Sequence, residues 1–211
     1  MQQMLLGVGA STKATYIDDI FSTYLYEETG STVTVNNGVD MSEGGMVWFK
    51  NREATDSHVL VDTVRGGTKV LHSNTTAAES TQSGAITSFN NNGFAIGNYG
   101  NINGGSNKDV VSWTFRKSPM FDVVTYTGNG SARTIAHSLA SVPGLIIVKG
   151  LTNTSGWEVY HRSTGATKTT RLDTNGATST SSTRWNDTEP TSTHFTVSTS
   201  SNVNESGSNY I

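Results

Sequence analysis

The pattern of apolar and polar residues predicts many short β-strands separated by turns. Between the strands, Asn- and Gly-rich segments such as residues 36–38 and 90–93 supply turn positions with positive φ at little cost. Many short strands that follow one another closely along the chain, with no helix between successive strands, are typical of an antiparallel β-sandwich or jelly roll. In the first half of the chain, the runs rich in β-branched and aromatic residues are residues 24–26, 32–35, 46–50, 58–64, 69–71, 85–89, 94–96 and 110–115.

The same pattern occurs twice along the chain. Residues 44–69 align without a gap with residues 143–168, which places Gly45 opposite Gly144 and Lys50 opposite Lys149. The alignment continues on both sides with slips of one or two residues, as loops allow. We therefore expect two copies of one structural unit of about 100 residues each.

This repeat predicts an all-β chain with an N-terminal arm (1–15), a first β-sandwich (16–117) and a second β-sandwich (118–211), with a short linker at residues 117–119. The first unit ends in the apolar strand 110–115, but the chain given ends before its second copy. The second unit is therefore expected to lack its last strand. A fragment of a longer polypeptide is the simplest interpretation, and a naturally short chain and a strand supplied by a neighbouring chain stay open.

Composition and charge argue against several kinds of partner and chemistry. Only 15% of residues are charged and the net charge is −3, with basic residues scattered singly, which argues against nucleic acid as a partner. The apolar run at residues 4–10 is too short for the core of a signal peptide and no basic residue precedes it, and no other segment approaches a membrane span, so no membrane partner is expected. The chain has no cysteine, which excludes disulfides, a thiolate nucleophile and Cys-based metal sites.

The titratable residues do not form a recognisable catalytic motif. A glycosidase needs two well-placed carboxyl groups, but the repeat places Asp62 opposite His161, so neither unit retains the other's candidate group. Five histidines lack metal-ligand spacing. We therefore predict no catalytic residue, no metal and no cofactor. The candidates, interpreted as solvated turn residues, are Asp18, Asp19, Glu27, Glu28, Asp62, Glu158 and His161.

Aromatic residues are the candidates for glycan binding, and mostly aliphatic residues are the candidates for assembly contacts. Trp48 and Trp113 lie within predicted strands and are expected in the core. Trp157 and Trp185 lie in loop-like contexts near Tyr160, where they either stack on a sugar or anchor a loop. The predicted glycan-stacking residues are Trp157, Trp185 and Tyr160, and the predicted assembly contacts are Met4, Leu5, Leu6, Tyr210 and Ile211.

Several longer segments resemble tail-associated proteins of marine tailed bacteriophages, including those of cyanobacteria. The resemblance covers nearly the whole chain, brings no catalytic or ligand residue, and implies a virion localisation. Members of that group look longer, which favours the fragment interpretation. The segments that carry the resemblance are TYIDDIFSTYLY (15–26), GGMVWFK (44–50), DTVRG (62–66), SWTFRKSPMFDVVTYTGNG (112–130) and RTIAHSLASVPGLIIVK (133–149).

Three functions follow as hypotheses. The first is a non-enzymatic tail fibre or spike component for host attachment, assembled as a homotrimer with other virion proteins, whose weak contacts to a host surface glycan gain from multivalency. The second is a capsid decoration or tail adaptor protein that docks through residues 1–14. The third is a surface-polysaccharide depolymerase. Fold alone does not distinguish these functions.

Overall fold

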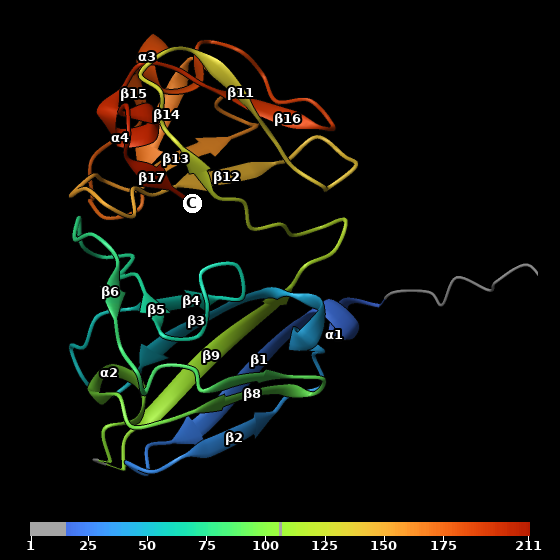
Figure 1. Cartoon of the computed structure of the whole chain (residues 1–211), viewed down its shortest axis with the longest axis vertical. Coiled ribbons are helices and arrows are strands. Elements are labelled where there is room, and N and C mark those ends of the chain that lie inside the picture. Colours follow the sequence, from blue (N-terminus) through green and yellow to red (C-terminus); the bar gives the residue numbers. More distant parts are fainter. Residues whose placement is uncertain (1–15, 106) are drawn as a thin grey trace, which may run out of the picture.

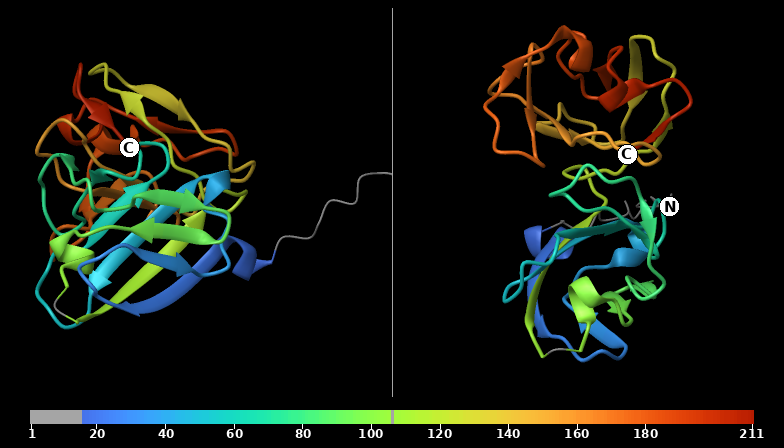
Figure 2. Two further views of the ribbon diagram at one scale, coloured as in Figure 1. Left: turned by 60° about the horizontal axis from the view of Figure 1, so that its bottom comes forward. Right: turned by 90° about the vertical axis from the view of Figure 1, so that its left-hand side faces the viewer.

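The computed structural model describes residues 16–105 and 107–211 and has the predicted all-β fold, with antiparallel sheets throughout these residues. Figure 1 shows two β units stacked along the long axis, joined by one connection on the side. Helices in the described residues are single turns of three or four residues. The C-terminus lies between the two units (Figures 1 and 2).

The first unit is a sandwich of two sheets. One sheet has the strand order β1-β9-β3-β4 and the other β2-β8-β7, with β5 pairing β6 beside them. The elements of this unit are α1 (Ile17–Ile20), β1 (Phe21–Glu27), β2 (Val33–Asn36), the 3-10 turn η1 (Met41–Glu43), β3 (Gly45–Asn51), β4 (Val59–Asp62), β5 (Lys69–Val70), β6 (Ser80–Thr81), β7 (Ser88–Asn90), β8 (Gly93–Ile96), α2 (Gly100–Asn103) and β9 (Asp109–Arg116).

Successive side chains of β3 point to opposite faces of the sheet, which explains how this unit forms two apolar surfaces. Val47 and Phe49 are fully buried and point into the sandwich, where Phe49 meets Phe94 of β8 edge to face, with ring centroids 5.5 Å apart. Met46 and Trp48 point to the opposite face of the sheet and pack in a second apolar cluster. The sheet therefore buries side chains on both faces.

The second unit repeats this arrangement with shorter strands. β12-β13-β14-β15 form its main sheet, β11 pairs β16, and β10 pairs β17. Its core gathers Ile135, Val148, Tyr160, Trp185 and Tyr210. The elements are β10 (Tyr126–Thr127), β11 (Arg133–Ala136), β12 (Leu145–Val148), β13 (Glu158–His161), β14 (Lys168–Arg171), β15 (Ser179–Thr180), α3 (Ser182–Trp185), β16 (His194–Val197), α4 (Ser201–Asn204) and β17 (Asn209–Tyr210).

Strand registers agree between the aligned halves. Met46 pairs with Asp62 across β3 and β4, and the aligned Leu145 pairs with His161 across β12 and β13. Tyr26 pairs with Val110 in the first unit, and Tyr126 pairs with Tyr210 in the second. Because register decides which side chains face the core, equal registers give both units the same inward and outward positions.

The apolar run Ile146-Ile147-Val148 lies in β12, which is not a central strand of its sheet. β12 stands at the end of its sheet, with only β13 beside it along Leu145–Val148. Both faces of the strand are nevertheless covered: Val148 belongs to the core of the second unit, whereas Ile147 packs in a cluster with residues of the first unit. The apolar run thus reflects burial by two units on opposite faces.

Candidate assembly site between the units

The two units meet through an apolar cluster that neither builds alone. Leu60 and Leu71 of the first unit and Trp157 of the second are its buried members. Met46 and Trp48 flank it from the first unit, and Ile147, Leu151 and Ile211 flank it from the second. Removal of this apolar surface from water contributes about 25 cal/mol per Å² of buried area, so the contact stabilises a fixed arrangement of the units.

Trp157 anchors this contact through its indole. The side chain is 3% exposed, and its Nε1–H donates to the backbone oxygens of His72 and Thr75 in the first unit, at 3.0 Å each. A hydrogen bond between backbone groups also crosses nearby, from the N–H of Glu79 to the oxygen of Leu151 at 2.9 Å. These directional bonds fix the orientation of the units as well as their contact.

Lys149 adds a buried ammonium to the same interface. Its Nζ donates to the oxygen of Thr76 in the first unit at 3.2 Å and to that of Ser155 at 2.9 Å. The aligned Lys50 binds three oxygens of its own following loop instead. Burial lowers the pKa of Lys149 to about 8, against an opposing effect of the Asp173 charge.

Equivalent faces of the two units form the contact. Met46 and Trp48 align with Leu145 and Ile147, and all four line the space between the units. An interface made from the same face of two similar bodies closes on itself, unlike a head-to-tail contact that repeats along a filament. The two units are therefore a closed pair.

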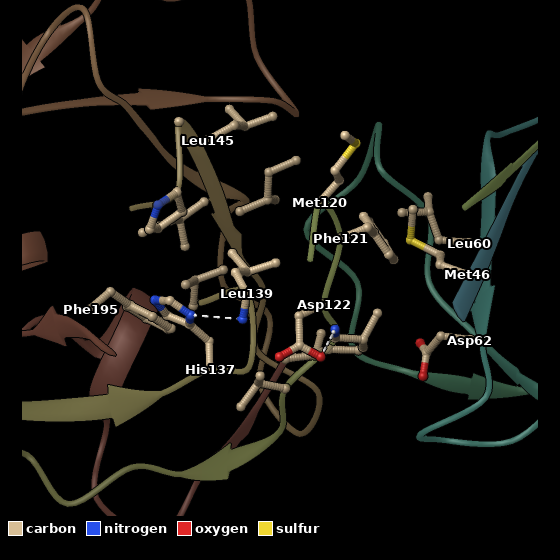
Figure 3. A pocket seen from close by; sticks show the side chains of 18 of the residues that line it. Met46, Leu60, Asp62, Met120, Phe121, Asp122, His137, Leu139, Leu145 and Phe195 are labelled. Carbon is tan, nitrogen blue, oxygen red and sulfur yellow. Dashed lines mark hydrogen bonds between the residues drawn. The ribbon is translucent and has the colours of Figure 1, made fainter. Parts of the chain in front are cut away.

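One side of the interface is hollow. A cavity of about 500 Å³ opens beside β12, and Figure 3 shows residues 120–122 crossing between its two walls. Met46, Leu60 and Asp62 belong to the wall on the first unit, and His137, Leu145 and Phe195 to the wall on the second. The lining is mostly apolar, so the site favours apolar surface over a polar substrate.

Several apolar residues at the rim of the cavity are exposed to solvent. Met120 is 75% exposed, Leu145 54% and Val142 52%. Single exposed apolar residues are ordinary, but several beside one apolar cavity are typical of an interaction site. This region is the candidate functional site of the molecule.

The prediction that three aromatic residues stack on a glycan is wrong. Trp157, Trp185 and Tyr160 are each 2–3% exposed and offer no face to a sugar. Trp185 packs against Tyr160 edge to face with centroids 6.1 Å apart, and the Tyr160 hydroxyl donates to Glu189 at 2.6 Å. The burial of Trp157 and Trp185 agrees with the alternative interpretation, hydrophobes that anchor loops, whereas Tyr160 lies within β13.

The expected core positions of Trp48 and Trp113 also need correction. Both side chains are only partly buried and lie on the outward face of the first unit's sheet, where their rings meet edge to face at 6.4 Å. The Trp48 Nε1–H donates to His58 Nδ1 at 3.0 Å. Local alternation identified strand positions correctly, but it does not say which face of a strand meets the sandwich core.

Two carboxylates interpreted as solvated turn residues are buried in ion pairs. Asp62 is 1% exposed and accepts from Arg65 Nε at 2.6 Å, and Arg65 also reaches Glu79 at 3.2 Å. Glu158 is fully buried, against Arg171 and Arg184. Such pairing gives both carboxylates a structural role.

The Glu158 cluster has a small hollow of about 200 Å³ beside it. Glu158 accepts from Thr169 at 2.7 Å and from Asn202 at 2.6 Å. Burial raises the pKa of Glu158, but these hydrogen bonds and the two arginine charges outweigh burial, and the pKa lies below its usual value. A carboxylate whose pKa is lowered in this way is a weak base, and its contacts join β13, β14, α3 and α4 structurally.

The predicted assembly residues fall into three groups. Ile211 packs in the cluster between the units and lines the cavity. Tyr210 is buried in the core of its own unit, where its ring stacks on that of Tyr126 with centroids 5.2 Å apart. The prediction that its side chain is an assembly contact is therefore wrong. Met4, Leu5 and Leu6 lie outside the described residues.

Within residues 16–105 and 107–211 we find no group of three or more His, Cys, Asp or Glu side chains placed to hold a metal ion. Across the same residues, none of the helices combines the length and apolar character needed to cross a bilayer.

Fold and site together define a tandem β-sandwich protein whose two units form a closed pair with an apolar cavity at their junction. The chain belongs to the family described as a domain of unknown function, DUF7483, whose model matches residues 17–211. No curated protein and no solved structure is significantly similar to the chain.

Proposed function

We propose that the chain is a non-enzymatic structural component of a tailed-bacteriophage particle, placed in a tail fibre or spike. The virion setting rests on the resemblance of segments such as residues 112–130 and 133–149 to phage tail-associated proteins. The observation that carries the structural role is the interface anchored by Trp157, which makes two β units into one stiff module.

The linker between the units supports this mechanical role. Lys117 pairs with Asp122 across the linker at 3.4 Å, and Ser118 and Phe121 exchange backbone bonds of 2.9 and 3.1 Å. The rings of Phe115 and Phe121 stack with centroids 5.2 Å apart. These contacts restrict the conformations of the linker, which is consistent with a stiff connection between the units.

Homotrimeric assembly, contact with other virion proteins and contact with a host surface glycan are proposed on the resemblance alone. Because Trp157, Trp185 and Tyr160 are buried, the glycan surface must be sought elsewhere. Multivalent display in a trimer would raise the effective concentration of each weak site.

A capsid decoration or tail adaptor protein is the second candidate. The closed pairing of equivalent faces favours it, since such a pair forms a compact module that does not extend by stacking further units through the same face. The buried, ion-paired carboxylates Asp62 and Glu158 give a depolymerase no support.

The test is localisation on the particle. An epitope tag would be added to the gene within the phage genome that carries it, and purified particles would be labelled with immunogold and imaged. Label on a tail appendage is the expected result, and label on the capsid or tail tube would favour the second candidate. Absence of the protein from purified particles, measured in parallel by mass spectrometry, would overturn the proposal.

A further inference from the structure

Five asparagines of this chain are followed directly by glycine, and such a pair can react with itself. They are Asn37, Asn92, Asn103, Asn129 and Asn175. The backbone nitrogen of the glycine can attack the side-chain carbonyl carbon of the asparagine, because glycine has no Cβ to hinder the approach. The attack needs a free glycine N–H, a free side-chain amide and a backbone that can move. The fold decides which of the five pairs meets these conditions.

The pairs at Asn37 and Asn92 hold each other in place. The N–H of Gly38 donates to Asn92 Oδ1 at 3.0 Å, and Asn37 Nδ2 donates to Thr114 Oγ1 at 2.8 Å. Gly93, which follows Asn92, is buried within β8. Both pairs are therefore fixed by their neighbours.

The pairs at Asn103 and Asn129 are fixed by other elements. Asn103 is fully buried, and its side chain makes four hydrogen bonds to backbone groups. Asn129 Oδ1 accepts from the N–H of Ser131 at 3.0 Å, and the N–H of Gly130 donates to the oxygen of Asn204 at 2.8 Å. Neither pair can bring its two reacting groups together without breaking these bonds.

Asn175 lies at the tip of the loop between β14 and β15, which pair at the base of this loop. Residues 174–177 are all exposed, and they make no hydrogen bond to any residue within 16–105 and 107–211. The space around Gly176 is open, since a Cβ built there would meet only Thr174 Oγ1, at 3.6 Å. This pair alone combines a free N–H, a free side chain and an unconstrained backbone in the described part of the chain.

The repeat explains why this loop tip is free. In the first unit the aligned loop lies at the junction, where the oxygens of Thr75 and Thr76 accept from Trp157 Nε1 and Lys149 Nζ. The contact between the units uses the loop of the first unit only. Its copy in the second unit faces solvent.

We propose that Asn175 is a self-modification site, at which the chain converts this asparagine into a mixture of aspartate and isoaspartate. A bond forms between the Gly176 nitrogen and Asn175 Cγ, and the bond between Cγ and Nδ2 breaks. Solvent carries the amide proton of Gly176 to the leaving nitrogen, which departs as ammonia. The product is a five-membered succinimide ring.

Water then opens the ring at one of its two carbonyl carbons. Cleavage between Cγ and the Gly176 nitrogen gives aspartate. Cleavage between that nitrogen and the backbone carbonyl carbon of residue 175 gives isoaspartate, in which the main chain runs through the former side chain. Neither step oxidises or reduces any atom, and water is the only co-reactant.

Both products add one negative charge to the second unit. The charge falls on the loop that supplies Thr174, Gly176 and Ala177 to the small hollow beside Glu158. Because the reaction needs only the chain and water, it does not depend on the proposed function.

The test follows the full 211-residue protein over time at 37 °C and pH 8, with tryptic digestion and mass spectrometry of samples. Trypsin releases residues 172–184, a peptide in which Asn175 is the only asparagine. We expect Asn175 to convert at least about 10-fold faster than any of the other four pairs while the protein is folded. In concentrated urea, where the hydrogen bonds of the other pairs are lost, the five rates should become similar.

Matched glycine variants separate the chemistry from folding. Gly176→Ala should slow conversion at least about 5-fold, because the added Cβ hinders the attack. It should leave the unfolding temperature unchanged, since the space around Gly176 is open and its φ lies outside the left-handed region. Gly100→Ala fills another open glycine position, which follows a tyrosine, and should leave the conversion of Asn175 unchanged.

Three results would overturn the proposal. Conversion of another pair as fast as that of Asn175 in the folded protein would mean that the free loop does not select the site. No conversion of Asn175 in the folded protein, while it reacts in urea, would mean that the loop is held. Aspartate without isoaspartate in peptide 172–184, measured with an isoaspartyl methyltransferase, would mean direct hydrolysis of the amide without a ring.

Discussion

At the residue scale, buried polar side chains decide where the two units are fixed. Lys149 and Lys50 occupy aligned positions, but only Lys149 directs its ammonium to the other unit, at Thr76. Glu158 aligns with Val59, so its ion-pair cluster is particular to the second unit. The repeat preserves the backbone while single side chains adapt each copy to its place.

Lys149 makes the free energy of unfolding depend on pH in the alkaline range. Its pKa is lowered to about 8 in the folded protein, whereas an unfolded lysine titrates near 10.4. Between these values the unfolded chain binds more protons, so the free energy of unfolding should rise with pH, by up to about 1.4 kcal/mol per unit from this group.

The Lys149→Met variant should lose this contribution. Urea unfolding at pH 7.5, 8.5 and 9.5 would give the difference between the original protein and the variant. A difference that grows with pH in favour of the original protein is expected, and parallel pH profiles would show that Lys149 does not titrate in this range.

Glu158 makes the free energy of unfolding depend on pH in the acid range, and here too stability rises as pH rises. Its pKa lies below the usual value in the folded state, so its stabilisation is complete above the unfolded pKa and is lost as pH falls through the folded pKa. Glu158→Gln should cost about 3 kcal/mol at pH 7, because Arg171 and Arg184 lose their counter-charge. Thermal unfolding from pH 7 to pH 3 should show the gap between the two proteins closing, and a constant gap would contradict this role.

At the element scale, the sequence predicted most strands because burial follows alternation. β2, β3, β8 and β9 lie within a residue or two of their expected positions. β4 ends earlier than expected, because Asp62 accepts the N–H groups of Val64 and Arg65 and begins a turn there.

The elements and site residues that the sequence did not reveal have non-local causes. β6 consists only of Ser80 and Thr81, which carry no apolar signal, and it forms because it pairs with β5. Trp157 follows a Thr-, Asn- and Ser-rich turn, and its burial depends on carbonyls 82 and 85 residues away. The cavity likewise arises only when both units are in place.

A repeated asparagine holds corresponding elements together in each unit. Asn103, at the end of α2, accepts from the N–H groups of Thr29 and Gly30 and donates to the oxygen of Gly97 at 2.8 Å. Asn204, at the end of α4, accepts from Asn129 and donates to the oxygen of Ser198, also at 2.8 Å. Both side chains are fully buried.

Replacement of either asparagine by leucine should destabilise its unit by about 3 kcal/mol, because several buried backbone groups lose their partners. Chemical unfolding of Asn103→Leu and Asn204→Leu would measure this cost, with the exposed Asn91→Leu as the matched control. A loss of unfolding free energy equal to that of the control would mean that the turns keep their structure without these side chains.

At the scale of the whole molecule, the central claim is that two β units form one stiff, closed pair. The absence of cysteine makes this directly measurable, since Asn91→Cys in the first unit and Asn175→Cys in the second introduce two exposed labelling sites. Loss of the buried Trp157 indole should cost about 3–5 kcal/mol of packing and remove both bonds to the first unit.

The decisive measurement is the distribution of distances between spin labels at these two cysteines, recorded by pulsed electron paramagnetic resonance. The account predicts one narrow distribution for the protein with native Trp157, and a broad one when Trp157→Ala is added, while each unit keeps its strand content by circular dichroism. Trp157→Phe, which keeps the apolar ring but not the N–H, should lie between them. A broad distribution with Trp157 intact would contradict the closed pair.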